Sequence, residues 1–381
     1  MKKPFKKIII VLVCVVLVVV LGGVVFVKTQ MTHHNKYGTP IPIKPSGDKV
    51  LDSIRRGVEF LRVHQEPNGG FSAGLLDPKP AFTALVADAL LSSPDGYHSD
   101  VPFVSRALDA IVSHQQEDGG IYTPSIGLAN YCTSIAVMAL SRSGDQYSKV
   151  IEKAQHFLTT IQNKDGGYSY STGGDSDLSN TVMAVEAIKK SGLSDEDDAY
   201  KKAIAFVTRC QNNSETNTEV WAGDDGGFIY RPENSKAGTK ELPDGKVEYV
   251  SYGLMSYAGL VSFLWAGVDK DDPRVTSAFE WVQTNWTLEE NRNLGKAGLY
   301  YYYLTMAKAL QAYGQRHITT SDGRTHDWPR ELSDKIVSMQ DTEGAWQNSN
   351  TKWFEGDKVL VTAYMIKTLS ICHKVMNEGG E

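Results

Sequence analysis

Two acidic residues that can take part in proton transfer precede an apolar stretch in the middle of the chain. Asp175 and Asp177 stand just before the segment that starts at Asn180. A carboxyl group placed beside a reacting atom acts as a general acid or base. Short polar side chains before an apolar helix also act as caps, and Ser179 or Asn180 can satisfy free backbone N–H groups there. We therefore treat Asp177, together with Asp175, as the candidate catalytic carboxylates, with a helix cap as the alternative.

Aromatic residues gather where apolar helical patterns begin, and they indicate a second kind of chemistry. Aromatic faces attract positive charge and also pack against long apolar chains. We predict a ligand cavity lined by side chains from these positions: Phe82, Tyr131, Asn180, Tyr252, Tyr300, Tyr302, Trp353 and Tyr364. In the run of tyrosines at 300–303, neighbouring helical positions point in different directions, so at most two of these rings face one cavity. The alternative is that the aromatic residues serve ordinary packing.

The sequence offers no recognisable set of residues for a metal ion or a cofactor. Cys132, Cys210 and Cys372 form no C-x-x-C pair, and buried thiols are the expected state for them. The sequence also contains no Gly-rich phosphate loop, no H-E-x-x-H pair and no calcium-binding loop. We therefore predict a protein that uses no metal and no cofactor.

The elements that must position these residues repeat along the chain. Gly-Gly pairs stand at 69–70, 119–120, 166–167 and 226–227, and Gly298 and Gly344 are related positions. Each turn follows a helical pattern with one apolar stripe and leads to a second helix that is apolar nearly all round. These second helices share the spacing T-x5-A-L at 83–90 and 133–140, with counterparts that start at Thr181, Gly253, Tyr303 and Thr362.

Six units of two helices follow from this pattern, and they predict an all-α fold. Helix-pair repeats can stack into an open solenoid or close on themselves. Strongly apolar inner helices favour closure, so we expect an α6/α6 toroid over residues 49–376. The polar stretch at 211–248 is then an insertion in the fourth unit, long enough to cover the mouth of a cavity.

The repeats resemble the QW-type repeat of squalene and oxidosqualene cyclases and of protein prenyltransferase β-subunits. Two units carry the pattern in full, with Arg56, Gly57, Phe60, Leu61, Gln65, Gly69 and Phe71 in one and Lys153, Ala154, Phe157, Leu158, Gln162, Gly166 and Tyr168 in the other. The sixth unit keeps Gln340, Gly344 and Trp346. The resemblance implies an α6/α6 barrel whose ligand cavity lies among the inner helices.

The resemblance also shows where the chemistry of these families is incomplete in this chain. Class II terpenoid cyclases protonate an alkene with the third residue of a D-x-D-D-T motif. Asp177 and Thr181 match its ends, but Ser179 and Asn180 replace the two acids between them. A serine hydroxyl is a far weaker acid than a carboxyl group. The set of zinc ligands that the prenyltransferases use is also incomplete, because Ser251 stands where the cysteine would be required.

These observations together favour a protein that binds or transforms an isoprenoid or another long apolar molecule. One alternative is a toroid without catalysis that binds a lipid, a peptide or a partner protein. A further alternative is a carbohydrate-active (α/α)6 barrel that uses two carboxylates across a polar cleft, such as Asp177 with Glu355 or Asp357.

The N-terminal residues predict an attachment to the cell membrane. Residues 8–27 are apolar and uncharged, about the length that spans a bilayer as a helix. Lysines in residues 1–7 predict a cytoplasmic N-terminus, and the residues that follow the span then lie outside the cytoplasm. We expect a single-pass signal anchor at 8–27 and a proline-containing linker at 28–48, with a cleaved signal peptide as the alternative.

The charge of the remaining chain excludes some partners. The net charge is −6, although every charged residue before position 29 is a lysine, so the part after the span is strongly acidic. Nucleic acid and anionic membrane surfaces attract basic proteins, and we therefore expect neither as a partner of this domain.

Overall fold

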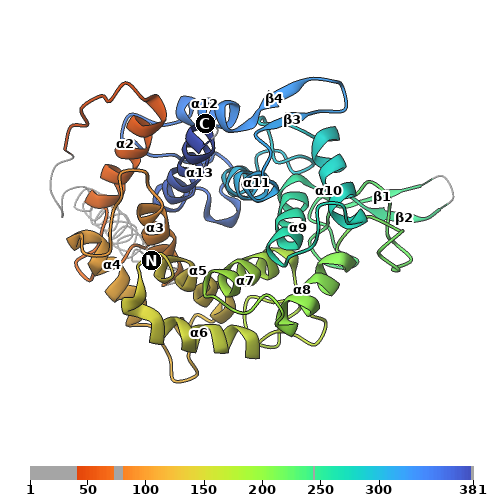
Figure 1. The fold of residues 1–381 in the computed structure, drawn as a ribbon, viewed down its shortest axis with the longest axis horizontal. Coiled ribbons are helices and arrows are strands. Elements are labelled where there is room, and N and C mark those ends of the chain that lie inside the picture. Colours follow the sequence, from red (N-terminus) through yellow and green to blue (C-terminus); the bar gives the residue numbers. More distant parts are fainter. Residues whose placement is uncertain (1–40, 73–79, 243–244, 379–381) are drawn as a thin grey trace, which may run out of the picture.

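Two concentric rings of helices form the protein (Figure 1). A computed structural model describes residues 41–72, 80–242 and 245–378, and the predicted membrane anchor at 8–27 lies outside them. The outer ring in this part of the chain consists of α2 (Lys49–Val63), α4 (Pro102–Val112), α6 (Ser148–Thr160), α8 (Asp198–Arg209), α10 (Pro273–Thr284) and α12 (Trp328–Ser338). The inner ring consists of α3 (Ala81–Leu91), α5 (Ala129–Leu140), α7 (Leu178–Lys190), α9 (Gly253–Trp265), α11 (Leu299–Tyr313) and α13 (Lys358–Glu378).

The two kinds of helix differ in how much of their surface is buried. The outer helix α2 buries one stripe that includes Ile54, Val58 and Leu61. In the inner helix α3, by contrast, all residues from Ala81 to Leu90 are buried. Each inner helix packs on the next, and α13 packs on α3, so the ring is closed. The described residues thus have the α6/α6 toroid that the repeats predicted.

A recurring arrangement of glutamine side chains links five of the six units to the unit that follows. Gln65 Nε2 donates hydrogen bonds to Gly69 O (2.9 Å) in its own turn and to Phe103 O (2.7 Å) in the first turn of α4. Gln115, Gln162, Gln211 and Gln340 make the corresponding pairs of bonds in their units. The last of them, Gln340, donates to Ser53 O in α2, which joins the sixth unit to the first (2.9 Å).

The first glycine of each turn lies against the backbone of the neighbouring outer helix. Gly166 has φ +89°, and a Cβ atom there would lie 2.0 Å from Lys202 O in α8. Gly344 makes the closing contact, with a Cβ position 2.7 Å from Arg56 O in α2. A side chain would therefore meet both a strained backbone and a carbonyl group, which explains why these positions hold glycine.

Hydroxyl groups on the inner helices fix the turns, and they correct the predicted register of one unit. Thr83 Oγ1 accepts a hydrogen bond from Phe71 N (3.0 Å), just after the Gly-Gly pair. In the fourth unit Ser256 Oγ accepts the same bond from Phe228 N (3.1 Å). Ser256, and not Gly253, is therefore the counterpart of Thr83, because the hydroxyl group and not the apolar spacing sets the alignment.

The fifth unit departs from the predicted plan. Gly298 is the N-cap residue of α11 in a left-handed conformation and is not a turn glycine of the Gly-Gly type. Gln283 Nε2 near the end of α10 donates to Thr319 O (2.8 Å) in strand β3 (His317–Thr319), which pairs with β4 (Thr325–Asp327). A hairpin between units five and six thus takes the place of the glutamine link.

The insertion in the fourth unit carries a second hairpin. Strands β1 (Thr239–Glu241) and β2 (Val247–Tyr249) pair antiparallel and project from the ring beside α10 (Figure 1). Short 3-10 helices η2 (Asp145–Tyr147) and η3 (Lys352–Phe354) complete the regular elements of the described residues. Cys132, Cys210 and Cys372 are buried thiols, as predicted.

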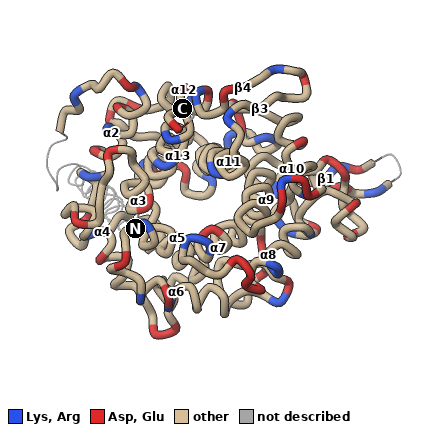
Figure 2. Tube along the Cα trace, viewed as in Figure 1, with Lys and Arg blue, Asp and Glu red and all other residues tan. Residues whose placement is uncertain are grey.

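A cluster of charged side chains lies inside the inner ring, toward the C-terminal ends of its helices. Lys367 of α13 pairs with Asp88 of α3 and lies 3.9 Å from Glu186 of α7. Arg142 and Asp88 are 2.6 Å apart, and Lys308 of α11 and Glu186 are also 2.6 Å apart. Most other charged positions lie on the outer helices and loops (Figure 2). The cluster therefore ties five inner-ring segments together electrostatically.

Among the described residues, α13 is long and apolar enough to span a bilayer by length and composition. Its most apolar stretch is 72% buried within the toroid. Its apolar composition is explained by its place in the core, since α13 packs on α2, α3, α11 and α12.

Candidate functional site

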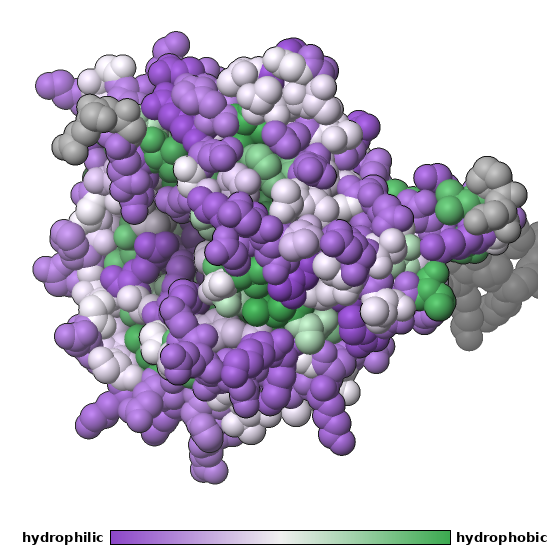
Figure 3. Space-filling view, turned by 45° about the vertical axis from the view of Figure 1, so that its right-hand side comes forward, coloured by the Kyte–Doolittle hydropathy of each residue, from purple (hydrophilic) through white to green (hydrophobic). Residues whose placement is uncertain are grey.

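A cavity of about 330 Å³ opens where the inner helices begin. Its apolar and polar lining is provided by Leu128, Ser179, Met183, Lys236, Leu254, Met255, Gly298, Glu355 and Leu360. Nine aromatic side chains supply the rest: Phe82, Tyr131, Tyr170, Tyr230, Tyr252, Tyr301, Trp353, Phe354 and Tyr364. Polar residues cover most of the outer surface, and apolar residues show mainly in recesses between them (Figure 3).

The aromatic rings come from several elements and contact one another across the site. Tyr301 of α11 stacks on Tyr364 of α13 with ring centroids 5.6 Å apart. Tyr131 of α5 lies 6.1 Å from Tyr170, which belongs to the loop before α7. The Phe82 ring of α3 lies edge to face with the ring of Phe354 in η3, before α13, with centroids 6.2 Å apart. Aromatic rings thus line the cavity from several sides.

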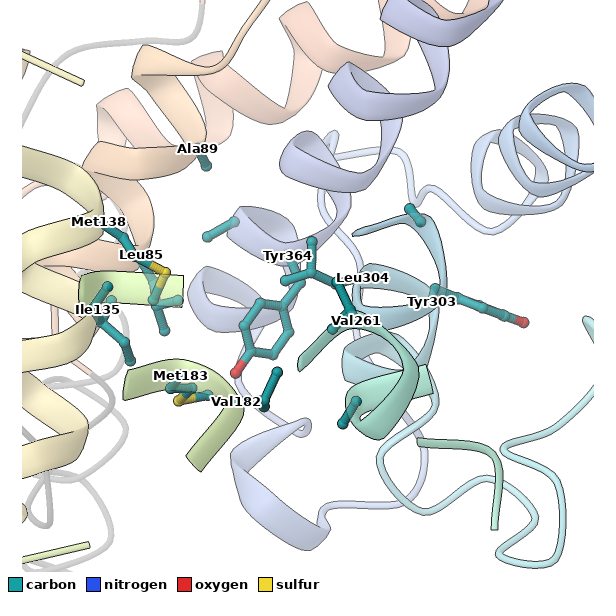
Figure 4. Packing of buried hydrophobic residues seen from close by; sticks show 14 of the residues in the cluster. Leu85, Ala89, Ile135, Met138, Val182, Met183, Val261, Tyr303, Leu304 and Tyr364 are labelled. Atoms are coloured by element: carbon teal, nitrogen blue, oxygen red, sulfur yellow. The ribbon is translucent and has the colours of Figure 1, made fainter. Parts of the chain in front are cut away.

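Five of the predicted cavity residues line the cavity and three do not. The five are Phe82, Tyr131, Tyr252, Trp353 and Tyr364. Tyr300 and Tyr302 are buried elsewhere, because their hydroxyl groups donate to Gln347 O (3.2 Å) and Thr287 O (2.8 Å). Tyr303 likewise points away from Tyr364 (Figure 4). Tyr301 is the member of this run that faces the cavity, since each helical position turns by about 100° from the one before it.

Asp177 is the N-cap residue of α7 and does not line the cavity. Its Oδ1 accepts from Asn180 N (2.9 Å) and its Oδ2 from Asn180 Nδ2 (2.8 Å). Burial raises the pKa of Asp177, and these hydrogen bonds act in the opposite direction. The cap is therefore Asp177 rather than Ser179 or Asn180. Asn180 is also absent from the cavity wall, because its side chain is turned toward Asp177.

Asp175 lies on the outside of the protein, contrary to its predicted place beside a reacting atom. Its carboxylate is 79% exposed and pairs with Arg231 Nη1 at 2.6 Å. Both residues border a separate depression on the surface. The charge of Asp175 is thus satisfied at the surface, two residues from a helix cap that is buried.

Ser179 takes the place on the cavity wall where the cyclase resemblance would put a proton-donating acid. It belongs to the first turn of α7 and lies beside Tyr301, which also lines the cavity. Burial raises the pKa of the Tyr301 phenol, and a hydrogen bond with the Ser179 side chain lowers it. This side of the cavity is therefore uncharged at neutral pH.

Among the described residues that line the cavity, Glu355 is the one that carries a carboxyl group. It is 1% exposed. Its Oε1 accepts from Tyr301 N (2.8 Å) at the start of α11, and its Oε2 accepts from Asn348 Nδ2 (2.6 Å). Burial raises the pKa of Glu355 to about 7, although its hydrogen bonds favour the ionised form. The group therefore titrates in the neutral range.

A strained loop holds Glu355 and two aromatic neighbours in place. Trp353 and Phe354 have φ values of 55° and 64°, which residues other than glycine rarely adopt. Their side chains are 44% and 46% exposed at the cavity mouth. Asn348 N donates to Glu355 O (2.9 Å) and closes the loop. Backbone strain of this kind gathers at functional sites, so the loop is part of the site.

The insertion at 211–248 contributes two residues to the cavity. Tyr230 and Lys236 line it, and Lys236 Nζ lies 4.1 Å from the centre of the Tyr230 ring. The insertion thus covers one side of the cavity mouth. Sequence reasoning identified the insertion but none of its contact residues, because an irregular loop has no periodicity from which side-chain directions follow.

Comparison with known proteins shows which families this chain is similar to. Residues 104–219 match the family described as the squalene-hopene cyclase N-terminal domain. The chain is 22% identical over 265 residues to squalene–hopene cyclase of Alicyclobacillus acidocaldarius, covering 66% of this chain and 40% of that protein. It is 27% identical over 172 residues to drimenyl diphosphate synthase of Streptantibioticus cattleyicolor, covering 41% of this chain and 31% of that enzyme.

Solved structures show the same architecture. An apo variant of the type II terpene cyclase MstE from Scytonema matches with a TM-score of 0.52 and 12% identity, over 86% of this chain and 98% of the other. A protein from Actinoplanes matches with a TM-score of 0.52 and 16% identity, over 86% and 100%. These likenesses show the fold. In sequence and in fold the chain is thus similar to members of the terpenoid cyclase superfamily.

Proposed function

We propose that this protein binds or transforms an isoprenoid or another long apolar small molecule in the cavity. The observation that carries the proposal is the wall of nine aromatic side chains at the start of the inner helices. The volume of about 330 Å³ lies at the lower end of the roughly 300–1,000 Å³ typical of small-molecule sites. A single extended chain suits such a space better than a large polar ligand.

The superfamily supports the same class of ligand. MstE was solved with geranylgeranyl dihydroxybenzoate as substrate, in a structure that matches this one with a TM-score of 0.51. The chain covers 40% and 31% of the two relatives named above, so their activities and substrates are part of the proposal. Ser179 stands in place of the family's acid, and a reaction in this cavity therefore needs another proton-transfer group.

A carbohydrate-active barrel is less well supported by the geometry. Such an enzyme uses two carboxylates that face one polar cleft. Asp177 caps α7, and Asp357 caps α13 by accepting from Leu360 N (2.9 Å). Among the described lining residues Glu355 then remains without a second carboxylate, and its surroundings are aromatic.

We also propose that residues 8–27 anchor the protein in the cell membrane, with the toroid outside the cytoplasm. The apolar span after a cluster of lysines supports this arrangement. Long apolar ligands partition into bilayers, so an anchored toroid would meet its ligand at high local concentration. Alkaline extraction should leave the full chain in the membrane fraction, and release into the supernatant would contradict the anchor.

The ligand class is tested on the full chain purified in detergent. Lipids that co-purify are extracted and identified by mass spectrometry, and heat stability is measured with geranylgeraniol and with cellobiose. We expect isoprenoid lipids in the extract and a higher Tm with geranylgeraniol only. Tyr301→Ala should remove most of this increase, whereas Tyr147→Ala, outside the ring at the start of α6, should not. An empty extract and an unchanged Tm would overturn the proposal.

A further inference from the structure

We propose that the end of the ring opposite the cavity binds a doubly charged oxyanion, such as a phosphate group, between Arg142, Lys190 and Lys308. These side chains belong to the ionic cluster inside the inner ring, in which positive charge exceeds negative charge. A free ion and a small phosphate ester both carry the group that such a site recognises. This second site is independent of the molecule that the cavity binds.

The ionic cluster contains more cations than carboxylates. Its members are four cations and two carboxylates: Arg142, Lys190, Lys308, Lys367, Asp88 and Glu186. Burial raises the pKa values of both carboxylates, but the surrounding cations hold them well below their usual range, so both are ionised at neutral pH. Among the described residues, no further carboxylate lies within ion-pair distance of the four cations. Two positive charges therefore have no counter-ion when all four cations are protonated.

The cations surround one centre inside the ring. Glu186 lies 2.8 Å from Lys190 Nζ and 2.6 Å from Lys308 Nζ. Electrostatic interactions also cross between the two carboxylates, from Arg142 to Glu186 and from Lys190 to Asp88. Charged positions of both signs are visible there within the ring of inner helices (Figure 2). An anion at this centre would thus meet cations from several helices at once.

Lys367 shows the effect of the excess charge. Its side chain is 5% exposed. Burial lowers its pKa to about 7, although Asp88 acts in the opposite direction, and the ammonium groups of Lys308 and Lys190 lower it as well. Buried charges in proteins are normally compensated by a partner. A bound dianion would supply the missing negative charge and keep Lys367 protonated.

The C-terminal ends of the inner helices offset only part of this excess. The helices α3, α5 and α7 end at the cluster, and each directs a partial negative charge of roughly half a unit toward it. The effect is confined to the last turn, and α11 and α13 continue for more than one turn beyond Lys308 and Lys367. The remaining inner helix, α9, contains no charged residue. The cluster therefore still attracts an anion.

The cluster is open to solvent on its outer side. The exposed fraction of the side chains falls from 35% at Arg142 and 27% at Lys190 to 13% at Lys308. Arg142 Nε donates to Asp88, whereas its Nη1 and Nη2 groups make no hydrogen bond within the described part of the chain. A guanidinium group with free N–H donors binds oxyanions with good geometry. Arg142 is therefore the residue at which an anion enters.

This site is separate from the cavity. Glu186 follows Ser179 of the cavity wall by about two turns of α7, and Lys308 follows Tyr301 by the same interval on α11, roughly 10 Å along each helix. Apolar side chains such as Leu85 lie inside the ring in the layer between them (Figure 4). Binding at the two ends can therefore be measured independently.

The experiment uses the full chain in detergent and sulfate as the probe. Sulfate keeps its double charge, whereas a phosphate group changes its charge near about pH 6. Calorimetry at constant ionic strength measures the affinity. We expect one sulfate ion per chain, bound more tightly at about pH 6 than at about pH 8, because Lys367 loses its proton between these values.

Three variants locate the site. Arg142→Gln and Lys190→Gln should each weaken sulfate binding about tenfold, because each removes a charge-assisted contact. Lys189→Gln is the matched control, since Lys189 is the neighbour of Lys190 on α7 but pairs with the exposed Asp195 at 2.5 Å. The control should bind sulfate as the wild type does.

The outcomes separate a specific site from general attraction. No saturable binding of sulfate, or equal affinity in the wild type and both site variants, would overturn the proposal. A loss in Lys189→Gln as large as in Lys190→Gln would overturn it too. If Arg142→Gln fails to fold, Lys190→Gln and the pH series on the wild-type protein still decide. When the site is present, tighter binding of glycerol 3-phosphate than of inorganic phosphate assigns it to a phosphate ester, and the reverse assigns it to the free ion.

Discussion

At the scale of single residues, the buried carboxylates of Asp177 and Glu355 have different roles. Asp177 accepts hydrogen bonds from Asn180 N and Nδ2 of its own helix and one from the Tyr230 phenol, and it does not itself line the cavity. Glu355 belongs to the loop before α13, and its carboxylate accepts a hydrogen bond from Tyr301 N at the start of α11. The same side chain also lines the cavity. The first therefore contributes to stability, and the second is free to interact with a ligand.

Asp177→Ala is expected to lower the stability of the protein without removing ligand binding. Loss of an N-cap acceptor costs about 1–2 kcal/mol, because two N–H groups of α7 lose their partner. Urea unfolding measures this loss, and a titration with dodecanol measures the cavity. Normal stability combined with lost binding would show instead that Asp177 acts on the ligand.

Glu355 should impose a pH dependence on the stability of the folded protein. Its pKa in the folded state, about 7, lies above its usual value of 4.5, so the folded protein binds this proton more tightly than the unfolded chain does. The contribution to stability is full at low pH and is lost as the pH rises through about 7. Urea unfolding between about pH 5 and pH 8 should show this decline in the wild-type protein. A Glu355→Gln variant with the same slope would refute it.

At the scale of the elements, the glutamine side chains explain why the units pack in a fixed order. Each one holds its own Gly turn and the first turn of the next outer helix at once, as Gln162 does with Gly166 O and Ala199 O. Two bonds from one amide group leave little freedom between neighbouring units. Loss of the amide therefore affects an interface and not only one turn.

Gln162→Ala should destabilise the toroid by roughly 1–3 kcal/mol, since two carbonyl groups lose a donor in a partly buried place. Gln146→Ala is the matched control, because Gln146 is an exposed residue of η2 and makes one long hydrogen bond of 3.5 Å to Ser143 O. The control should stay within about 0.5 kcal/mol of wild type in urea unfolding. Equal effects of the two changes would argue against the link between units.

The sequence determines these elements more clearly than it determines the directions of their side chains. Helix pairs, Gly turns and glutamine links repeat along the chain. The residue types that each of them needs therefore recur in the sequence at a regular spacing. The cavity faces were harder to predict, because a shift of one position turns a side chain by about 100°, and Tyr301 faces inward where Tyr300 and Tyr302 were expected. Glu355 depends on a loop with two left-handed residues, which no periodic pattern indicates.

At the scale of the whole molecule, the buried ionic cluster joins the two ends of the ring. Asp88 belongs to the first unit and Lys367 to the sixth, and both side chains are almost fully buried. Burial alone would raise the pKa values of Asp88 and Glu186, but the surrounding ammonium and guanidinium groups hold both well below their usual range. These carboxylates thus contribute stability above about pH 4 that is lost as the pH falls.

Asp88→Asn should cost about 3–5 kcal/mol, because it leaves Lys367 buried without a full counter-charge. Asp95→Asn is the control, since Asp95 pairs with Arg55 near the surface and its loss should cost less than about 1 kcal/mol. Urea unfolding compares the two variants. The double change Asp88→Asn with Lys367→Met should cost less than the sum of its parts, and strict additivity would show that the two residues do not interact.

The closing contacts also bear on how the chain is made. Asp88 and Lys367 are 279 positions apart, and Gln340 and Ser53 are 287 apart. On the ribosome, the apolar face of α3 that α13 covers therefore stays open until nearly the whole domain has been synthesised. The early units can pair with their neighbours but cannot complete the ring. We therefore expect a chain that ends before α13 to leave this apolar face of α3 exposed and to aggregate.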